Sequence, residues 1–198
     1  MKPAGVLALQ GDYARHCEKI TELGSSNLLV KNKDQLSDVA SLVIPGGEST
    51  TLLKLLDEDF REALVEFSES GKPVFATCAG AILVAKAVTN PSQFSLSLID
   101  IDIERNSYGR QVDSSVTEIP LTDQGQSFLL ESQSFIEGVF IRAPRIKRVG
   151  ENVEVLATLG SDPVLVRCRN VVVATFHPEL SDGNSLIHAN SLGLNSTL

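Results

Sequence analysis

Short apolar runs alternate with helix-like segments through the first half of the chain. Four such runs predict buried strands: 5–10, 27–31, 41–45 and 73–78. Helical spacing follows three of them, at 13–23, at 51–70 (one or two helices) and at 79–88. Strands alternating with helices imply right-handed crossovers. The pattern therefore predicts a three-layer α/β fold, with a mostly parallel central sheet and helices on both faces.

The second half of the chain has a different pattern. Strand-like runs with short turns occupy 96–105, 111–119, 138–149, 153–159, 163–169 and 171–176. These runs predict antiparallel strands that are added to the main sheet. The tail, 181–198, is mostly polar and predicts a short, weak helix or a weakly structured, frayed end. The length, 198 residues, fits one domain spanning 1–198.

Charge and hydropathy narrow the possible partners. The formal net charge is −8, with 42% apolar residues. An acidic chain is a poor partner for nucleic acid, because binding to phosphate backbones relies on clusters of Lys and Arg. The apolar run near the N-terminus ends at Gln10, which is too short for a membrane span or a signal segment. We therefore expect neither nucleic acid nor membrane as a partner.

Cysteine usage indicates a reducing compartment. Cys17, Cys78 and Cys168 are widely spaced and odd in number, and no C-x-x-C pattern is present. A disulfide framework is not expected, and a cytoplasmic protein fits better. Cys17 and Cys168 fit an ordinary helix and an ordinary strand.

Cys78 is a candidate nucleophile because it stands between a predicted strand and a predicted helix. A helix N-terminus offers free N–H groups and a partial positive charge, which favour a thiolate. A sharp strand-to-helix turn also presents the sulfur to solvent, and it needs small neighbours such as Ala76, Ala79 and Gly80. The alternative is a buried apolar cysteine at a helix start, and the local pattern leaves it open.

A second candidate is His177, which follows the strongly apolar run 171–176. Pro178 favours extended geometry at His177, and residues two apart in extended chain point the same way. The Glu179 carboxylate can therefore reach one ring nitrogen and leave the other as a base. The alternative is a histidine at a strand end with a solvated glutamate. His16 and His188 have no comparable acid nearby in sequence, and we expect both at the surface.

Two adjacent glycines, Gly46 and Gly47, follow the predicted strand 41–45. Without Cβ atoms they allow backbone N–H groups to point into a cleft, as an oxyanion hole requires. The alternative is a plain helix start capped by Ser49 or Thr50. All three features lie at carboxyl ends of predicted strands, where open parallel sheets bind ligands. Together they indicate acyl-transfer chemistry.

Several motifs add a resemblance to a known family: GVLALQGD, LVIPGGESTT, ATCAGAILVAK, IERNSYGRQVDSS, FIRAPRI, ENVEVLA and FHPEL. In this order they are similar to the glutaminase subunits of pyridoxal 5'-phosphate synthase. That family belongs to the class I, or triad, glutamine amidotransferases, which have a flavodoxin-like fold. The resemblance covers about residues 4–180 and implies hydrolysis of glutamine to glutamate and ammonia.

The resemblance also implies roles for individual residues. It makes Cys78 the nucleophile, His177 the acid–base and Glu179 its orienting partner, with backbone N–H groups of Gly47 and Ala79 as the oxyanion hole. The residues that it implies for binding glutamine are Gln10, Gly46, Gly47, Glu48, Ser49, Ala79, Arg105, Ile141 and Arg142. Without the motif match, Arg105 and Arg142 would fit surface ion pairs. The implied partner is a (β/α)8-barrel synthase subunit that consumes the ammonia, and no metal or cofactor is expected in this chain.

One departure from the family pattern concerns the turn before the cysteine. Members of the family usually carry glycine at the position of Ala76, so we expect a slightly shifted but working turn. Two other readings stay open at this point. One is a catalytically weak subunit that docks on the same synthase. The other is a class I amidotransferase that supplies a different ammonia acceptor.

Overall fold

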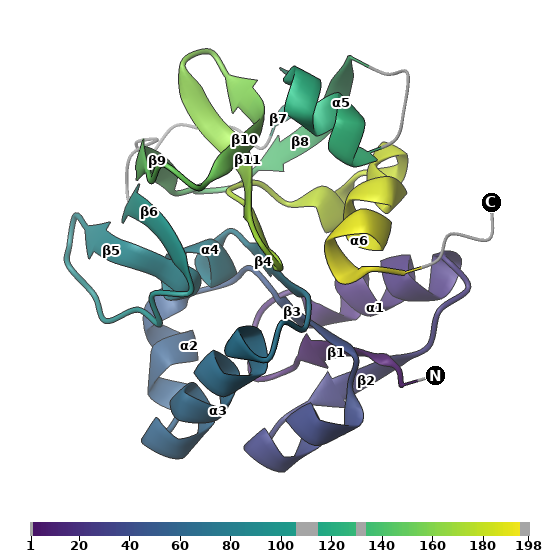
Figure 1. The fold of residues 1–198 in the computed structure, drawn as a ribbon, viewed down its shortest axis with the longest axis vertical. Coiled ribbons are helices and arrows are strands. Elements are labelled where there is room, and N and C mark those ends of the chain that lie inside the picture. The colour runs from purple at the N-terminus through teal and green to yellow at the C-terminus, as the bar shows by residue number, and fades with distance from the viewer. Residues whose placement is uncertain (1, 106–114, 130–133, 195–198) are drawn as a thin grey trace.

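The computed structural model describes residues 2–105, 115–129 and 134–194. Five parallel strands form the middle of its main sheet, in the spatial order β12 (Val171–Ala174), β4 (Val74–Thr77), β3 (Ser41–Ile44), β1 (Ala4–Leu7) and β2 (Asn27–Val30). Two antiparallel strands, β11 (Asp162–Cys168) and β10 (Glu154–Leu159), extend the sheet beyond β12 (Figure 1). The predicted α/β fold with a mostly parallel central sheet is confirmed.

Side chains of the central strands alternate between two cores, one on each face of the sheet. On β4, Val74 and Ala76 face one core, and Phe75 faces the other. Because side chains of a strand point to opposite faces in turn, a strand buried on both faces must be apolar throughout. This explains why the central strands appear in the sequence as continuous apolar runs.

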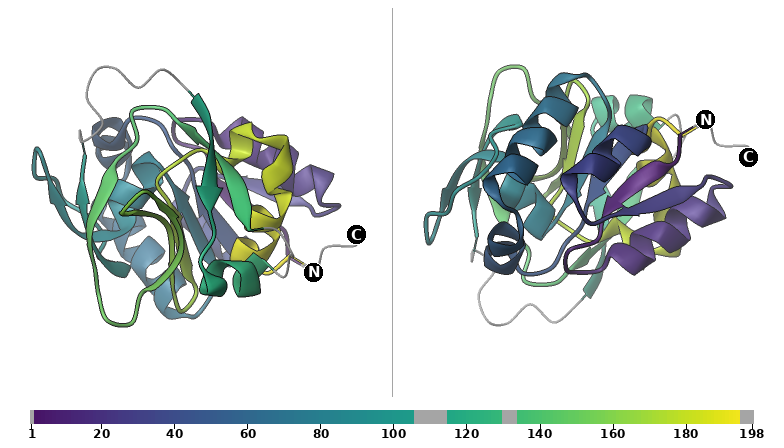
Figure 2. Two further views of the ribbon diagram at one scale, coloured as in Figure 1. Left: turned by 90° about the horizontal axis from the view of Figure 1, so that it is seen from above. Right: turned by 90° about the horizontal axis from the view of Figure 1, so that it is seen from below.

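Helices cover both faces of the main sheet (Figures 1 and 2). One core is closed by α2 (Ser49–Leu55), α3 (Glu58–Glu69), α4 (Ala79–Val84) and the 3-10 helix η1 (Lys33–Asp38). The other is closed by α1 (Tyr13–Glu22), α5 (Asp123–Leu129) and α6 (Ser185–Leu192). The segment 51–70 contains two helices, because Asp57 caps α3 by accepting a hydrogen bond from the Phe60 N–H at 2.8 Å. None of the described helices is long and apolar enough to cross a membrane.

Two small sheets stand apart from the main sheet. β5 (Ala85–Thr89), β6 (Ile99–Glu104) and β9 (Arg145–Val149) form one, and β7 (Ser115–Pro120) pairs with β8 (Phe135–Phe140) in the other. The expectation that all later strands join the main sheet as antiparallel additions is therefore wrong, since only β10, β11 and β12 join it, and β12 is parallel to β4. Of the strand predicted at 111–119, residues 111–114 lie outside the described ranges.

Two predicted elements are divided in the structure. The helix predicted over 79–88 ends at Val84, and its remainder forms β5. Periodicity does not separate a buried helix from a buried strand in so short an apolar run. The strand predicted over 138–149 is interrupted after Phe140, where Arg142 has φ 47 and Pro144 follows. This interruption matters, because it turns Arg142 out of the sheet.

The tail is more ordered than its composition predicts. After the short turns η2 (Pro178–Leu180) and η3 (Asp182–Asn184), α6 lies against α1 (Figure 1). Ile187 and Leu192 are 1% and 3% exposed. Of the two alternatives predicted for the tail, a short helix or a weakly structured end, the structure has the short helix, and 195–198 lie outside the described residues. Few apolar side chains suffice here, because small and polar ones also pack in this interface.

Candidate active site

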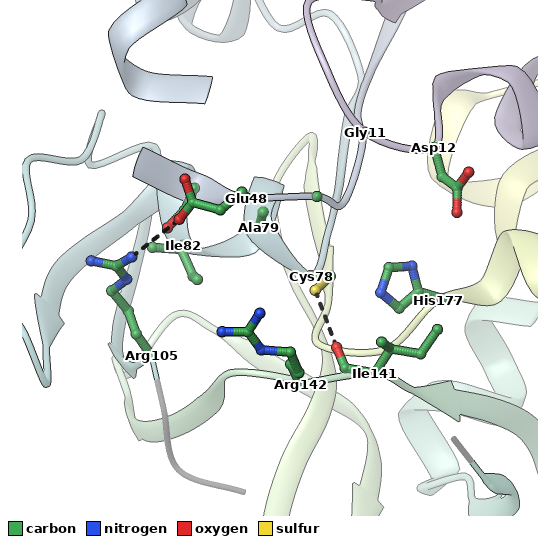
Figure 3. Close-up of a pocket in the computed structure, with 12 residues that line it drawn as sticks. Gly11, Asp12, Glu48, Cys78, Ala79, Ile82, Arg105, Ile141, Arg142 and His177 are labelled. Carbon is green, nitrogen blue, oxygen red and sulfur yellow. Dashed lines mark hydrogen bonds and ion pairs between the residues drawn. The ribbon is translucent and has the colours of Figure 1, made fainter. Parts of the chain in front are cut away.

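The candidate site lies at the carboxyl ends of β1, β3, β4 and β12, where the loops that follow four parallel strands meet. A pocket of about 420 Å³ opens there. Its lining residues are Gly11, Asp12, Gly47, Glu48, Ser49, Cys78, Ala79, Ile82, Arg105, Ile141, Arg142 and His177 (Figure 3). This edge of an open parallel sheet is the usual place for a ligand.

Cys78 occupies a sharp turn between β4 and α4. Its φ is 47 and its ψ −103, a conformation that L-residues avoid, and its N–H donates to the Ala174 carbonyl at 2.9 Å. A Cβ on Gly80 would lie 2.1 Å from the Ile44 carbonyl oxygen, so only glycine fits at that position. The turn holds the sulfur at the pocket wall, 4.0 Å from the Ile141 carbonyl oxygen. The cysteine is 6% exposed, so it is covered but faces the pocket.

The backbone at Ala76, where the family usually has glycine, is not strained. Ala76 is fully buried in β4, and it is absent from the residues with positive φ among those described. The strained position is Cys78 itself, two residues later. Ala76 therefore has no backbone strain that would shift the turn, because a methyl group fits an extended strand without cost, and the slight shift relative to the family stays a prediction.

His177 is held between Cys78 and Glu179. Its Nδ1 lies 2.7 Å from Oε1 of Glu179, so the predicted contact between these two residues is present. Residues 178–180 form a 3-10 turn rather than extended chain, and this turn brings the carboxylate back to the ring. A Cβ on Gly46 would lie 2.6 Å from Cε1 of His177 and 3.1 Å from Cβ of Cys78. Ring and cysteine therefore flank the same glycine.

The surroundings of His177 favour its protonated form. Burial lowers the pKa of the ring, but hydrogen bonds with Cys78 and Glu179 outweigh burial and raise the pKa to about 10. Glu179 is 2% exposed, so its contact with the ring is little screened by water. The arrangement can take a proton from the thiol and hold it on the ring.

The segment after β3 supplies one wall of the pocket. Gly47 has φ 137, and a Cβ there would lie 2.3 Å from Oε1 of Gln10. Glu48, not Ser49 or Thr50, caps α2, and its side chain accepts from the Thr51 N–H at 2.7 Å. Its pKa is lowered to about 2, chiefly by the hydrogen bond from the Thr50 hydroxyl. The pocket therefore carries a fixed negative charge at this wall.

Two arginines face Glu48 across the pocket. Arg105 follows β6, and its Nη2 lies 3.7 Å from Oε1 of Glu48. Arg142 follows β8 and points into the same space (Figure 3). Of the R-N-S-Y-G-R-Q motif, only Arg105 lies within the described residues. The pocket thus offers two carboxylates, those of Asp12 and Glu48, and two guanidinium groups to a ligand.

Three of the residues predicted for the site lie behind the pocket wall. Gln10 accepts from the Glu48 N–H at 2.9 Å, Gly46 backs Cys78 and His177, and Glu179 backs His177. The structure adds Gly11, Asp12 and Ile82 to the lining, and sequence reasoning did not assign them. Gly11 and Asp12 directly follow a predicted strand, so the strand-end rule was the signal that could have found them.

His16 and His188 are not at the surface, so that prediction is wrong. Both are 0% exposed, and Nδ1 of His16 lies 2.9 Å from Nε2 of His188. They meet because α1 and α6 pack side by side over Phe75, whose ring contacts both histidines edge-on. Nε2 of His16 also lies 3.5 Å from Oε2 of Glu179. An acidic neighbour that can orient His16 therefore exists in space, although Glu179 is far from it in sequence.

Within the described ranges, no group of three His, Cys, Asp or Glu side chains is arranged to hold a metal. A thiol, an imidazole and a carboxylate at the carboxyl edge of a parallel sheet define the class of α/β proteins equipped for thiol-based acyl transfer. The chain belongs to the SNO glutamine amidotransferase family, whose model matches residues 6–191.

Relatives and a solved structure agree with this family. The chain is 48% identical over 184 residues to pyridoxal 5'-phosphate synthase subunit PdxT of Solibacter usitatus, covering 92% of this chain and 94% of that protein. It is 49% identical over 179 residues to the subunit of the same name in Thermotoga maritima, covering 90% and 92%. A crystal structure of a glutamine amidotransferase is similar with a TM-score of 0.85 and 41% identity, covering 96% of this chain and 97% of that one.

Proposed function

We propose that this chain is the glutaminase subunit of a pyridoxal 5'-phosphate synthase. It would hydrolyse L-glutamine to L-glutamate and ammonia and deliver the ammonia for vitamin B6 synthesis. The observation that carries the proposal is the placement of Cys78 and His177 on one pocket, with Glu179 bound behind the ring. The similarity to synthase subunits over nine-tenths of the chain gives the acceptor of the ammonia.

The proposed reaction begins with transfer of the Cys78 proton to His177. The sulfur then attacks the carboxamide carbon of glutamine and forms a tetrahedral intermediate. Its oxyanion would accept hydrogen bonds from the backbone N–H groups of Gly47 and Ala79, the latter at the first position of α4. His177 returns the proton to the departing nitrogen. Departure of ammonia then produces a thioester on Cys78. Water, with its proton taken by His177, hydrolyses the thioester to glutamate and restores the thiol.

The charges of the pocket match a free amino acid. The fork of an arginine forms two parallel hydrogen bonds with a carboxylate, so Arg105 and Arg142 suit the α-carboxylate of glutamine. Glu48, whose pKa is lowered to about 2, suits the α-ammonium group. Ser49 lies beside it, and Ile141 contributes its backbone near Cys78. Gln10 and Gly46 would act from behind by fixing the segment that carries Gly47.

The proposed partner is a synthase subunit with a (β/α)8 barrel. Ammonia released into water would be lost, so the glutaminase must dock where the ammonia is consumed. The pyridoxal phosphate would form on the partner, and this chain would need no cofactor of its own. We place the complex in the cytoplasm, in keeping with the three free cysteines.

The test is glutamate release from glutamine by the full chain, with and without the synthase subunit of the same organism. We expect release that depends on the synthase. Cys78→Ala should lower the rate about 10⁴-fold or more, because it removes the nucleophile. The matched control is Cys168→Ala, the same change in β11 outside the pocket, which should leave the rate intact.

Each alternative has its own outcome in this experiment. Binding of the synthase without glutamate release would indicate a docking subunit with little catalysis. A rate of glutamate release that does not depend on the synthase would indicate an amidotransferase that supplies another acceptor. Release that survives Cys78→Ala would contradict the proposed chemistry altogether.

A further inference from the structure

A chain of buried polar contacts continues behind the candidate triad. Oε1 of Glu179 contacts His177, while Oε2 points the other way, 3.5 Å from Nε2 of His16. His16 also lies 3.3 Å from the Thr77 hydroxyl and 2.9 Å from His188. His16, His188 and Glu179 are all at most 2% exposed. Two histidines outside the pocket are therefore connected to its chemistry through one carboxylate.

The direction of the hydrogen bonds follows from the carboxylate end of this series of contacts. Nδ1 of His188 forms no hydrogen bond of ordinary length and angle with a described residue, although the Asn184 backbone interacts with this ring. Oε2 of Glu179, a carboxylate oxygen, accepts and does not donate, so the proton of the His16 ring lies on Nε2, which faces it. Nδ1 of His16 is then an acceptor, and Nε2 of His188 donates to it.

The Nε2 proton of His16 faces a carboxylate oxygen that otherwise lacks a hydrogen-bond donor. Oε2 of Glu179 accepts no hydrogen bond of ordinary length from another described residue, and Nε2 of His16 is the nitrogen that faces it at 3.5 Å. A buried carboxylate oxygen without a donor is unfavourable, so the N–H of His16 is its natural partner. The 3.5 Å separation is long, but catalytic hydrogen bonds are often long without substrate and shorten when it binds.

Both histidines remain neutral in these surroundings. Burial, followed by the rings of His188 and His177, lowers the pKa of His16 well below its usual value. Burial and then the ammonium group of Lys19 lower the pKa of His188 to about 3. A neutral donor can orient Glu179 without cancelling its negative charge. That charge remains available to the protonated His177.

Other charged groups also face Glu179, from the side opposite the pocket. A cavity of about 180 Å³ connects Glu179 with α1 and η3. Its titratable lining consists of Arg15, Glu18, Lys19, Glu22, Glu179 and Asp182. Lys19 is paired with Glu22 at 3.1 Å and with Asp182 at 3.4 Å, so its charge is already engaged. This leaves His16 as the donor in contact with Oε2.

We propose that His16 is a positioning residue of the site, which holds Glu179 through Nε2–H and is itself fixed by His188. The inference rests on the proposed glutaminase function. In this role His16 touches neither substrate nor sulfur. It fixes the carboxylate, the carboxylate fixes the tautomer of His177, and the ring serves Cys78.

Two substitutions of similar size separate positioning from packing. The amide of His16→Gln reaches the place of Nε2 and can still donate to Glu179. The amide of His16→Asn reaches the place of Nδ1, so it keeps a partner in His188 but leaves Glu179 without a donor. We expect His16→Asn to lower kcat about 10-fold or more with KM nearly unchanged, and His16→Gln to retain most of kcat.

The pH dependence of kcat separates the two roles of His16, because a loss of packing alone would not shift it. Without the His16 donor, Glu179 is held less firmly against His177, so the ring loses part of the hydrogen bond that raises its pKa. The alkaline limb of kcat, where His177 loses its proton, should therefore move to lower pH in His16→Asn and stay in place in His16→Gln. Ile187→Val, a buried apolar change on α6 that removes no polar group, is the stability control and should leave kcat and its profile unchanged.

A titration of His177 by NMR tests the inference without turnover. The chain has only three histidines, so the ring signals can be assigned. We expect a lower His177 pKa in His16→Asn than in the native chain. Equal kcat losses in both His16 variants that follow their melting temperatures, with an unchanged His177 pKa, would overturn the inference. If the native complex releases no glutamate, the proposed function fails, and the titration still decides the role of His16.

Discussion

Backbone strain in the Cys78 turn is concentrated at the cysteine. Cys78 has φ 47, whereas Ala76 lies in regular strand geometry between two cores. A second strained residue, Ser97, has φ 56 just before β6. Non-glycine residues rarely adopt such values, so their persistence at Cys78 means that the surrounding structure imposes them. Substitution by glycine should therefore change the unfolding free energy in opposite directions at a regular strand position, such as Ala76, and at a position with positive φ, such as Ser97.

We therefore predict opposite effects for Ala76→Gly and Ser97→Gly. Glycine at 76 only loosens a strand and should cost about 1 kcal/mol of unfolding free energy, with activity preserved. Glycine at 97 relieves a left-handed conformation and should raise the unfolding free energy by up to about 1 kcal/mol. Urea unfolding and glutaminase assays of both variants provide the measurement. A large loss of activity in Ala76→Gly would contradict this description of the turn.

At the scale of elements, α6 packs into the core although few of its residues are apolar. Its apolar residues are few, but Ile187 and Leu192 are buried, and His188 forms a hydrogen bond with His16 on α1. The helix therefore closes one of the two cores. It also carries the residue that fixes His16.

Leu192→Ala tests whether α6 is an integral part of the fold. Because Leu192 is 3% exposed, its truncation should cost about 3 kcal/mol of unfolding free energy through lost burial and a residual cavity. Leu55→Ala is the matched control, since Leu55 is 49% exposed and its truncation should change stability by less than about 0.5 kcal/mol. Chemical unfolding of both variants provides the comparison. Equal, small losses would show that α6 is only loosely attached.

At the scale of the whole molecule, the three histidines give stability a maximum near neutral pH. In the unfolded chain all three bind protons below about pH 6.5. The folded pKa values of His16 and His188 are lowered, that of His188 to about 3, so their contribution is present above about pH 6.5 and is lost as the solution is acidified below that pH. The folded pKa of His177 is raised to about 10, so its contribution is present below about pH 6.5 and is lost as pH rises toward about 10.

We predict that unfolding takes up about two protons near pH 5.5, one for each buried neutral histidine. The free energy of unfolding should then fall by about 1.4 kcal/mol per pH unit for each histidine as the solution is acidified. Glu48 has a pKa lowered to about 2, and its contribution is lost mainly at lower pH. Urea unfolding at a series of pH values measures the slope, and His188→Asn should remove about one proton from it. A flat profile between about pH 5 and 6.5 would contradict the buried, neutral state of the pair.

Much of this protein follows from local patterns in its sequence. The apolar runs predict the central strands, because a strand buried on both faces must be apolar throughout. The small residues around Cys78, and the acid two residues after His177, indicate the chemistry of the site. Strand order in an open parallel sheet then brings these segments to one edge. The motifs that resemble glutaminase subunits indicate the family by themselves.

Only the tertiary structure decided what meets across long separations in the chain. His16 and His188 are 172 positions apart, and nothing local to either predicts that α1 and α6 bury them together. The strain at Cys78 depends on the Ala174 and Ile44 carbonyls of neighbouring strands. The separation of the small sheets likewise depends on which surfaces the main sheet leaves open. Sequence patterns record the burial of single residues, whereas partners in a buried polar network are selected by packing.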